Sequence, residues 1–165
     1  MTDFAFLHAA DLHLDSPLLG LARRGESAQA FLSASRRALT ALVDAAIARR
    51  VAFLVIAGDV YDGDWKDWST GQVFAREMGR LARENIPVFM LRGNHDAESV
   101  ITRQLTLPAN VHEFATSRPQ TLTLDALKVA LHGQGFAERR ANEDIAQAYP
   151  AATPGWFNIG VLHTS

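Results

Sequence analysis

Cysteine is absent from the sequence, and its absence removes several kinds of chemistry at once. Disulfide bonds, thiolate catalysis and metal sites built on cysteine are all excluded. Any bound metal ion would have to be held by aspartate, glutamate, histidine or asparagine. Such oxygen and nitrogen ligands favour hard or borderline metal ions.

Long hydrophobic runs and an excess of positive charge are also lacking. No apolar run approaches the ~20 residues of a membrane-spanning helix, and no basic segment precedes the first apolar one. We therefore expect a cytoplasmic protein with no membrane association. The formal net charge is -2, which argues against clamping nucleic acid by charge alone. It neither excludes nor supports a nucleic-acid substrate.

The composition is that of an ordinary globular protein, with 48% hydrophobic and 21% charged residues. A chain of 165 residues is long enough to bury a proper core. We expect a single domain that covers residues 1–165.

Hydrophobic periodicity predicts alternating strands and helices in the first half of the chain. Strands are expected at Phe4–Ala9, Val51–Ala57 and Ile86–Met90, and amphipathic helices at Phe31–Ile47 and Trp68–Glu84. This order indicates a parallel sheet with right-handed crossovers. The second strand is apolar throughout, which suits burial on both faces.

The pattern changes beyond Pro108. Two apolar segments, Gln120–Leu124 and Leu127–His132, are separated by only two residues and predict a hairpin, so this half should be antiparallel or mixed. A short helix is expected at Asn142–Tyr149 and a last strand at Phe157–His163.

Polar residues follow three of the expected strands. The three motifs are Asp11-x-His13, Gly58-Asp59-x-x-Asp62 and Gly93-Asn94-His95-Asp96, the last of them expected in a loop. Adjacent parallel strands bring such ends to one edge of a sheet. The arrangement suits a two-metal site in which Asp59 bridges cations ~3.5–4 Å apart. Such cations would polarise a phosphoryl oxygen and activate a water, as phosphoester hydrolysis requires.

These motifs, in this order, resemble those of the calcineurin-like metallophosphoesterase superfamily. The surrounding segments Phe6–Pro17 and Gly58–Asp67 resemble the SbcD-like branch of bacterial DNA-repair exonucleases. The resemblance extends from Phe4 to His163. It implies an α/β fold built as a four-layer αββα sandwich, in which two mixed sheets are flanked by helices.

The resemblance also implies a set of metal ligands. Asp11 and His13 would bind one ion, Asn94 and His163 the other, and Asp59 would bridge the two. Manganese is the expected cation, with iron and zinc as alternatives, because this mixture of carboxylate, amide and imidazole ligands does not select strongly.

His95 would be a catalytic acid rather than a ligand, and Asp62 would keep its imidazole oriented and protonated. The superfamily normally supplies a further Gly-His-x-His motif, one histidine for each metal, whereas this sequence ends two residues after His163. We therefore expect the chain to be the amino-terminal part of the domain.

The expected function is metal-dependent phosphodiester hydrolysis by a DNA exonuclease or endonuclease of the DNA-repair type. DNA is the expected substrate and an ATPase subunit is a candidate partner. Two alternatives stay open. One is a phosphatase or phosphodiesterase for nucleotides or other small molecules, and the other is a non-catalytic scaffold that lacks part of the metal site.

Some residues near the motifs are expected to have structural roles. Trp65 and Trp68 would pack against the following helix rather than stack on bases. His112 would lie on the surface and His132 in a turn at a strand end. Among the arginines, Arg92 is expected to approach the site most closely.

Overall fold

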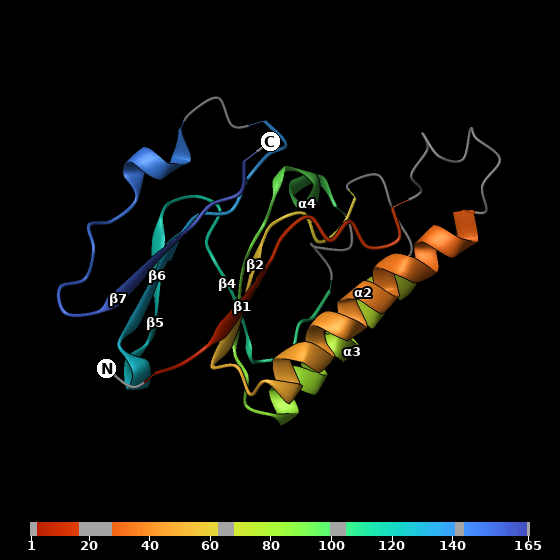
Figure 1. The fold of residues 1–165 in the computed structure, drawn as a ribbon. Helices are drawn as coiled ribbons and strands as arrows, with labels where there is room; N and C mark the ends of the chain where they lie inside the picture. Colours follow the sequence, from red (N-terminus) through yellow and green to blue (C-terminus); the bar gives the residue numbers. More distant parts are fainter. Residues whose placement is uncertain (1–2, 17–27, 63–67, 100–104, 141–143, 165) are drawn as a thin grey trace.

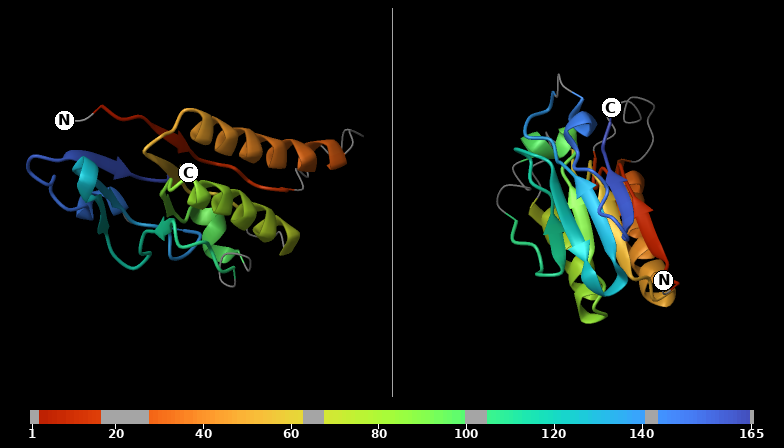
Figure 2. Two further views of the ribbon diagram at one scale, coloured as in Figure 1. Left: turned by 90° about the horizontal axis from the view of Figure 1, so that it is seen from below. Right: turned by 90° about the vertical axis from the view of Figure 1, so that its left-hand side faces the viewer.

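The computed structural model describes residues 3–16, 28–62, 68–99, 105–140 and 144–164. Two sheets pack face to face, and two long helices cover the outer face of the first sheet (Figures 1 and 2). These layers confirm the expected α/β fold with two sheets. Of the four expected layers, the described residues form three, because beyond β4 they contain only 3-10 helices. None of the helices in the described ranges is both long and apolar enough to cross a membrane.

The first sheet has the strand order β1-β2-β3-β4. Its strands are β1 (Phe6–Ala9), β2 (Phe53–Ala57), β3 (Val88–Leu91) and β4 (Val111–Glu113). All three pairings are parallel, which confirms the parallel sheet predicted from the order of strands and helices and differs from the mixed sheet that the resemblance implies. The reason lies in the connections, because each parallel pairing requires a crossover.

Two of the crossovers are the long helices. Helix α2 (Ala28–Ala48) connects β1 to β2, and α3 (Trp68–Arg83) connects β2 to β3. Both lie on the same face of the sheet, side by side (Figure 1). The two helices predicted from periodicity are therefore present, with ends within a few residues of those expected.

The second sheet is mixed, as expected, and has the order β5-β6-β7. Strands β5 (Gln120–Leu124) and β6 (Val129–Gly133) are antiparallel, whereas β6 and β7 (Phe157–Val161) are parallel. The hairpin turn is longer than predicted. A 3-10 helix, η1 (Asp125–Leu127), and a left-handed Lys128 with φ 52° form it, so β6 begins two residues later than expected.

The helix expected at residues 142–149 is a shorter 3-10 helix, η2 (Ile145–Ala148), and Asn142 lies outside the described residues. Its N-cap, Asp144, accepts a hydrogen bond from the N–H of Ala146. The hydroxyl of Tyr149 donates to the carbonyl of Val161 at 2.6 Å and so ties this segment to the end of β7.

Strand β2 is buried on both faces, as its apolar run predicts. Leu54 and Ile56 belong to the core that packs against the helices. Phe53 and Val55 alternate with them and belong to the core between the two sheets. The central strand therefore joins the two cores and holds the residues that follow it in a rigid frame.

Candidate metal centre

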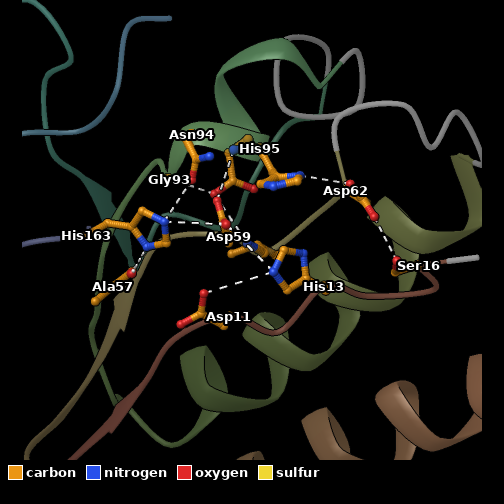
Figure 3. Close-up of polar contacts among 12 residues, drawn as sticks. Asp11, His13, Ser16, Ala57, Asp59, Asp62, Gly93, Asn94, His95 and His163 are labelled. Atoms are coloured by element: carbon orange, nitrogen blue, oxygen red, sulfur yellow. Dashed lines mark hydrogen bonds and ion pairs between the residues drawn. The ribbon is translucent and has the colours of Figure 1, made fainter. Parts of the chain in front are cut away.

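Four chain segments deliver polar side chains to one edge of the sandwich (Figure 3). Asp11 lies two residues beyond β1 and Asp59 two residues beyond β2, while α4 (Asn94–Glu98) begins three residues beyond β3. His163 comes from the second sheet, two residues beyond β7. The convergence of parallel strand ends is the arrangement expected from the sequence.

The loops after β1 and β2 run side by side. The N–H groups of Asp11 and His13 donate to the carbonyls of Gly58 and Asp59, at 3.1 and 3.0 Å. Asp11, His13 and Asp59 all have positive φ, at 54°, 38° and 53°. Aspartate and histidine enter this left-handed region more readily than most residues. Backbone strain of this kind is concentrated at functional sites.

Two glycines let the chain close tightly around Asp59. A Cβ atom on Gly93 would lie 2.1 Å from Oδ1 of Asp59. A Cβ atom on Gly58, which has φ 88°, would lie 2.6 Å from Nδ1 of His163. Any side chain at either position would displace a residue of the site.

Asp11, His13 and Asp59 form one group of candidate ligands. Nε2 of His13 is 4.0 Å from Oδ1 of Asp11 and 3.7 Å from Oδ2 of Asp59. These separations are too long for hydrogen bonds. They do suit a shared cation, because ligand atoms about 2.1 Å from one ion lie about 3 to 4 Å from each other.

His163, Asn94 and Asp59 form a second group. Nδ1 of His163 lies 2.9 Å from the carbonyl oxygen of Ala57, which can only accept a proton. In a neutral imidazole Nε2 then carries a lone pair. That nitrogen faces two further acceptor atoms, Oδ1 of Asn94 at 3.0 Å and Oδ2 of Asp59 at 3.4 Å.

A divalent cation bound between these three atoms would accept a lone pair from each of them. Histidine ligands of metals commonly donate their other ring N–H to a backbone carbonyl, as His163 does to Ala57. The donor set of imidazole, amide oxygen and carboxylate, all of it buried, fits such an ion.

Asp59 belongs to both groups and is only 3% exposed. Its two oxygens have different surroundings. Oδ1 accepts a hydrogen bond from the N–H of His95 at 3.0 Å. Oδ2 faces both histidines, His13 at 3.7 Å and His163 at 3.4 Å, so it is the oxygen positioned to be shared.

His95 lies beside these groups and pairs with Asp62, as predicted. Nδ1 of His95 is 2.9 Å from Oδ1 of Asp62, while Oδ2 of Asp62 accepts from the hydroxyl of Ser16 at 2.7 Å. Burial acts to raise the pKa of Asp62, but the hydrogen bonds with Ser16 and His95 outweigh it and hold this pKa below its ordinary value. The carboxylate is therefore ionised where it meets the imidazole.

His95, Asp62 and His13 also have ligand atoms close enough together to hold an ion. The rings of His13 and His95 meet edge to face, with centroids 5.2 Å apart. Geometry therefore allows two uses of His95, as an acid or as a ligand. His13 belongs to both groups of candidate ligands.

Asp96 has a different place from the one expected. The sequence predicts that it emerges with Asn94 and His95 in one loop, but the stretch forms the first turn of α4 and Asp96 is 1% exposed. Its carboxylate accepts from the N–H groups of Gly93, Val60 and Tyr61, at 2.9, 3.2 and 2.9 Å. It thereby holds the loop after β2 against the loop after β3.

Burial raises the pKa of the Asp96 carboxyl above its ordinary value, although its three N–H donors lower it. A local signal for this role exists, because an acidic residue three positions after an N-cap commonly bonds back to the cap N–H.

Asp15 is a third buried aspartate, 2% exposed, for which the sequence predicts no role. Its oxygens accept from Nε of Arg36 at 2.8 Å and from the hydroxyl of Thr70 at 2.5 Å. Its own N–H donates to the hydroxyl of Ser35 at 3.1 Å. The loop after β1 is therefore fastened to both α2 and α3. Nothing in the local sequence pattern pairs Asp15 with residues so distant in the chain.

The sequence also predicts roles for Arg92 and for the two tryptophans near the motifs. Arg92 does not turn a free guanidinium to the site, since it pairs with Glu113 through Nε at 2.6 Å and Nη2 at 3.1 Å. Trp68 begins α3 but is 47% exposed, so it does not pack as expected. Trp65 lies outside the described residues.

The other two histidines considered in the sequence, His112 and His132, make contacts away from the site. His112 is exposed, as expected, and stacks on Phe89 with ring centroids 5.3 Å apart. His132 lies within β6 rather than in a turn, and its two ring nitrogens are bonded to Thr121 and Asn158. Neither has a place in the ligand groups.

Comparison with known proteins matches residues 4–155 to the calcineurin-like phosphoesterase family. An uncharacterized metallophosphoesterase of Bacillus subtilis, YhaO, is 32% identical over 167 residues, which cover 99% of this chain and 41% of that protein. The DNA double-strand break repair protein Mre11 of Archaeoglobus fulgidus is 33% identical over 95 residues, which cover 57% of this chain and 20% of that protein.

The chain thus spans less than half the length of these relatives. The family match covers the three strand-end motifs and most of both sheets. Metal ions are used throughout this family, and the two ligand groups around Asp59 provide for them. The chain belongs to the calcineurin-like phosphoesterase family.

Proposed function

We propose that this chain forms the catalytic site of a metal-dependent phosphodiester hydrolase that acts on DNA. One observation carries the proposal. Lone pairs of His163, Asn94 and Asp59 converge on one point, and Asp59 turns the same oxygen toward His13. Because Nδ1 of His163 faces the carbonyl of Ala57, a cation at this point would satisfy all three acceptors at once.

Five residues would hold two divalent ions. Asp11 and His13 would bind the first ion, Asn94 and His163 the second, and Oδ2 of Asp59 would contact both. When bound, the ions would stabilise the negative charge of the phosphoryl group and lower the pKa of an attacking water. Manganese is the ion that we propose, with iron and zinc as alternatives, because a mixture of carboxylate, amide and imidazole ligands does not select strongly among them.

His95 would act on the leaving group. Because Nδ1 of its ring faces the ionised Asp62, the imidazole is held in one orientation. Its Nε2–H would then donate the proton to the departing oxygen. The hydrogen bond from the N–H of His95 to Asp59 keeps this acid next to the candidate ligands.

Two observations support DNA as the substrate. The relative from Archaeoglobus fulgidus is named as a DNA double-strand break repair protein. In the described part of the chain, the side chain of Asp11 is 62% exposed and that of His13 is 33% exposed, so a long polymer can reach them. An exposed site of this kind does not require a small substrate.

The test uses the full-length gene product that contains these residues, stripped of metal and reloaded with manganese. We expect metal-dependent cleavage of linear DNA and of bis(p-nitrophenyl) phosphate, and little hydrolysis of p-nitrophenyl phosphate or cyclic nucleotides. Hydrolysis restricted to monoesters or cyclic nucleotides would contradict the DNA assignment. Failure with every phosphoester, whichever divalent metal is added, would contradict the hydrolase proposal itself.

A further inference from the structure

Ser16 is the residue behind the His95–Asp62 pair. Its hydroxyl donates to Oδ2 of Asp62 at 2.7 Å, while Oδ1 of the same carboxylate faces Nδ1 of His95 at 2.9 Å. The three side chains form a line in Figure 3 that leads from the loop after β1 to the centre of the site. Among the described residues, each oxygen of Asp62 therefore has one hydrogen-bond partner, and the two partners lie in different segments of the chain.

The backbone at Ser16 is anchored, because the two residues before it, Leu14 and Asp15, are buried. Leu14 is part of the helix-side core and forms a parallel bridge with Tyr61, the neighbour of Asp62. Asp15 is held by Arg36 and Thr70, from α2 and α3. The N–H of Ser16 donates to the carbonyl of His13 at 3.1 Å. The hydroxyl of Ser16 is thus aimed from an anchored backbone.

Asp62 needs such support more than a buried residue would. Its side chain and that of His95 are both about one quarter exposed, so packing restrains the carboxylate less than it would in a closed core. A general acid must keep its proton-bearing nitrogen in hydrogen-bond reach of the leaving oxygen. A carboxylate free to rotate would let the imidazole turn away from that position.

We propose that Ser16 is a positioning residue for the general acid, and that it acts by fixing the carboxylate of Asp62, which in turn orients His95. The inference rests on the proposed hydrolase function. It adds a residue for which the sequence motifs assign no role, since Ser16 lies outside all three of them.

The test compares leaving groups in the metal-loaded full-length protein. A p-nitrophenyl diester releases a stable anion and needs no acid, whereas a DNA phosphodiester releases an alkoxide that must be protonated. Ser16→Ala should lower kcat on DNA by about tenfold, a fraction of what a general acid contributes. It should leave KM, and kcat on bis(p-nitrophenyl) phosphate, nearly unchanged.

Two variants serve as controls. Ser16→Thr keeps a hydroxyl at the same place and should restore the rate on DNA. Ser117→Ala changes an exposed serine in the loop between β4 and β5 and should behave like the unmodified protein. Equal losses on both substrates, or no loss on DNA, would overturn the inference. Absence of activity in the unmodified protein would instead count against the proposed function.

A second measurement does not depend on activity. In the metal-free protein, a nitrogen–proton NMR spectrum reports the Nδ1 proton of His95 that is hydrogen-bonded to Asp62. This signal should be present in the unmodified protein and in Ser16→Thr, and should broaden or disappear in Ser16→Ala. An unchanged signal in Ser16→Ala would mean that Asp62 is held without Ser16, and the inference would fail.

Discussion

Asp59 divides two tasks between its two oxygens. Oδ1 accepts the hydrogen bond from the N–H of His95, while Oδ2 faces His13 and His163. A substitution that keeps the first oxygen and replaces the second therefore separates the fold from metal binding.

Asp59→Asn is the corresponding variant. Its amide oxygen can still accept from His95, but the amide nitrogen would point toward the cations with its protons. We expect the bound manganese to fall from two ions per chain to fewer than one, with little change in unfolding temperature. Titration calorimetry with the metal-free protein measures the stoichiometry.

Asp125→Asn removes an exposed carboxylate of η1 and provides the matched control. If Asp59→Asn binds both ions normally, Asp59 is not the bridge.

His95→Asn distinguishes the two roles that the geometry allows. As a general acid, His95 can be lost without loss of metal, so we expect normal manganese content and a decrease in turnover on DNA of about 100-fold or more. Metal analysis and steady-state kinetics on one preparation provide both values. Loss of one ion would instead assign His95 to the ligand group with His13 and Asp62.

At the scale of elements, the site depends on how closely β2 and β3 end beside each other. Gly93 lies so close to Asp59 that the site requires a residue without a side chain at this position. Asp96 in α4 then ties the same two loops together through three backbone N–H groups. The short helix α4 thus positions the loop of another strand as well as its own residues.

Gly93→Ala should disturb this contact. Its Cβ atom would lie 2.1 Å from Oδ1 and 2.6 Å from the backbone nitrogen of Asp59, so the loop must move. We expect the free energy of unfolding to fall by about 1 to 3 kcal/mol, and manganese affinity to fall as well. Chemical denaturation and calorimetry measure the two effects.

Gly79→Ala is the control, because a Cβ atom there meets no atom within 4 Å. In the middle of α3 this change should stabilise the protein by up to about 1 kcal/mol. Similar destabilisation by the two substitutions would show that crowding at Asp59 is not the cause.

At the scale of the whole molecule, the site needs both sheets, because one ligand of the second group comes from the second sheet. Asp11, His13 and Asp59 follow strands of the first sheet, whereas His163 follows β7 of the second. The core between the sheets therefore sets the distance between His163 and Asn94. Weaker packing there should affect one ion more than the other.

Leu131→Ala tests this dependence. Leu131 lies fully buried in β6 between the sheets, so the truncation should lower the free energy of unfolding by about 2 to 5 kcal/mol. We expect weaker binding of the ion held by Asn94 and His163, and little change for the other ion. A two-step manganese titration resolves the two events.

Met78→Ala removes a side chain of comparable size from the core beneath α3. It should reduce stability similarly but leave both affinities nearly unchanged. Equal effects of the two variants on metal binding would contradict the division of the site between the sheets.

Much of this architecture could be predicted from sequence because it is encoded locally. The helical period of apolar residues identifies α2 and α3, and an unbroken apolar run identifies β2, which is buried on both faces. The sequence also predicts that the polar motifs after β1, β2 and β3 lie close together, because parallel strands end at one edge of a sheet.

The tertiary structure alone decided which distant groups meet. His163 lies beside Ala57 and Asn94, 106 and 69 positions earlier in the chain, because two independently predicted sheets pack face to face. Asp96 turned inward, Asp15 reached Arg36, and Ser16 reached Asp62 for the same reason. The periodicity of apolar residues predicts which face of a helix or strand is buried. Which residue contacts that face depends on how the elements pack together in the folded molecule.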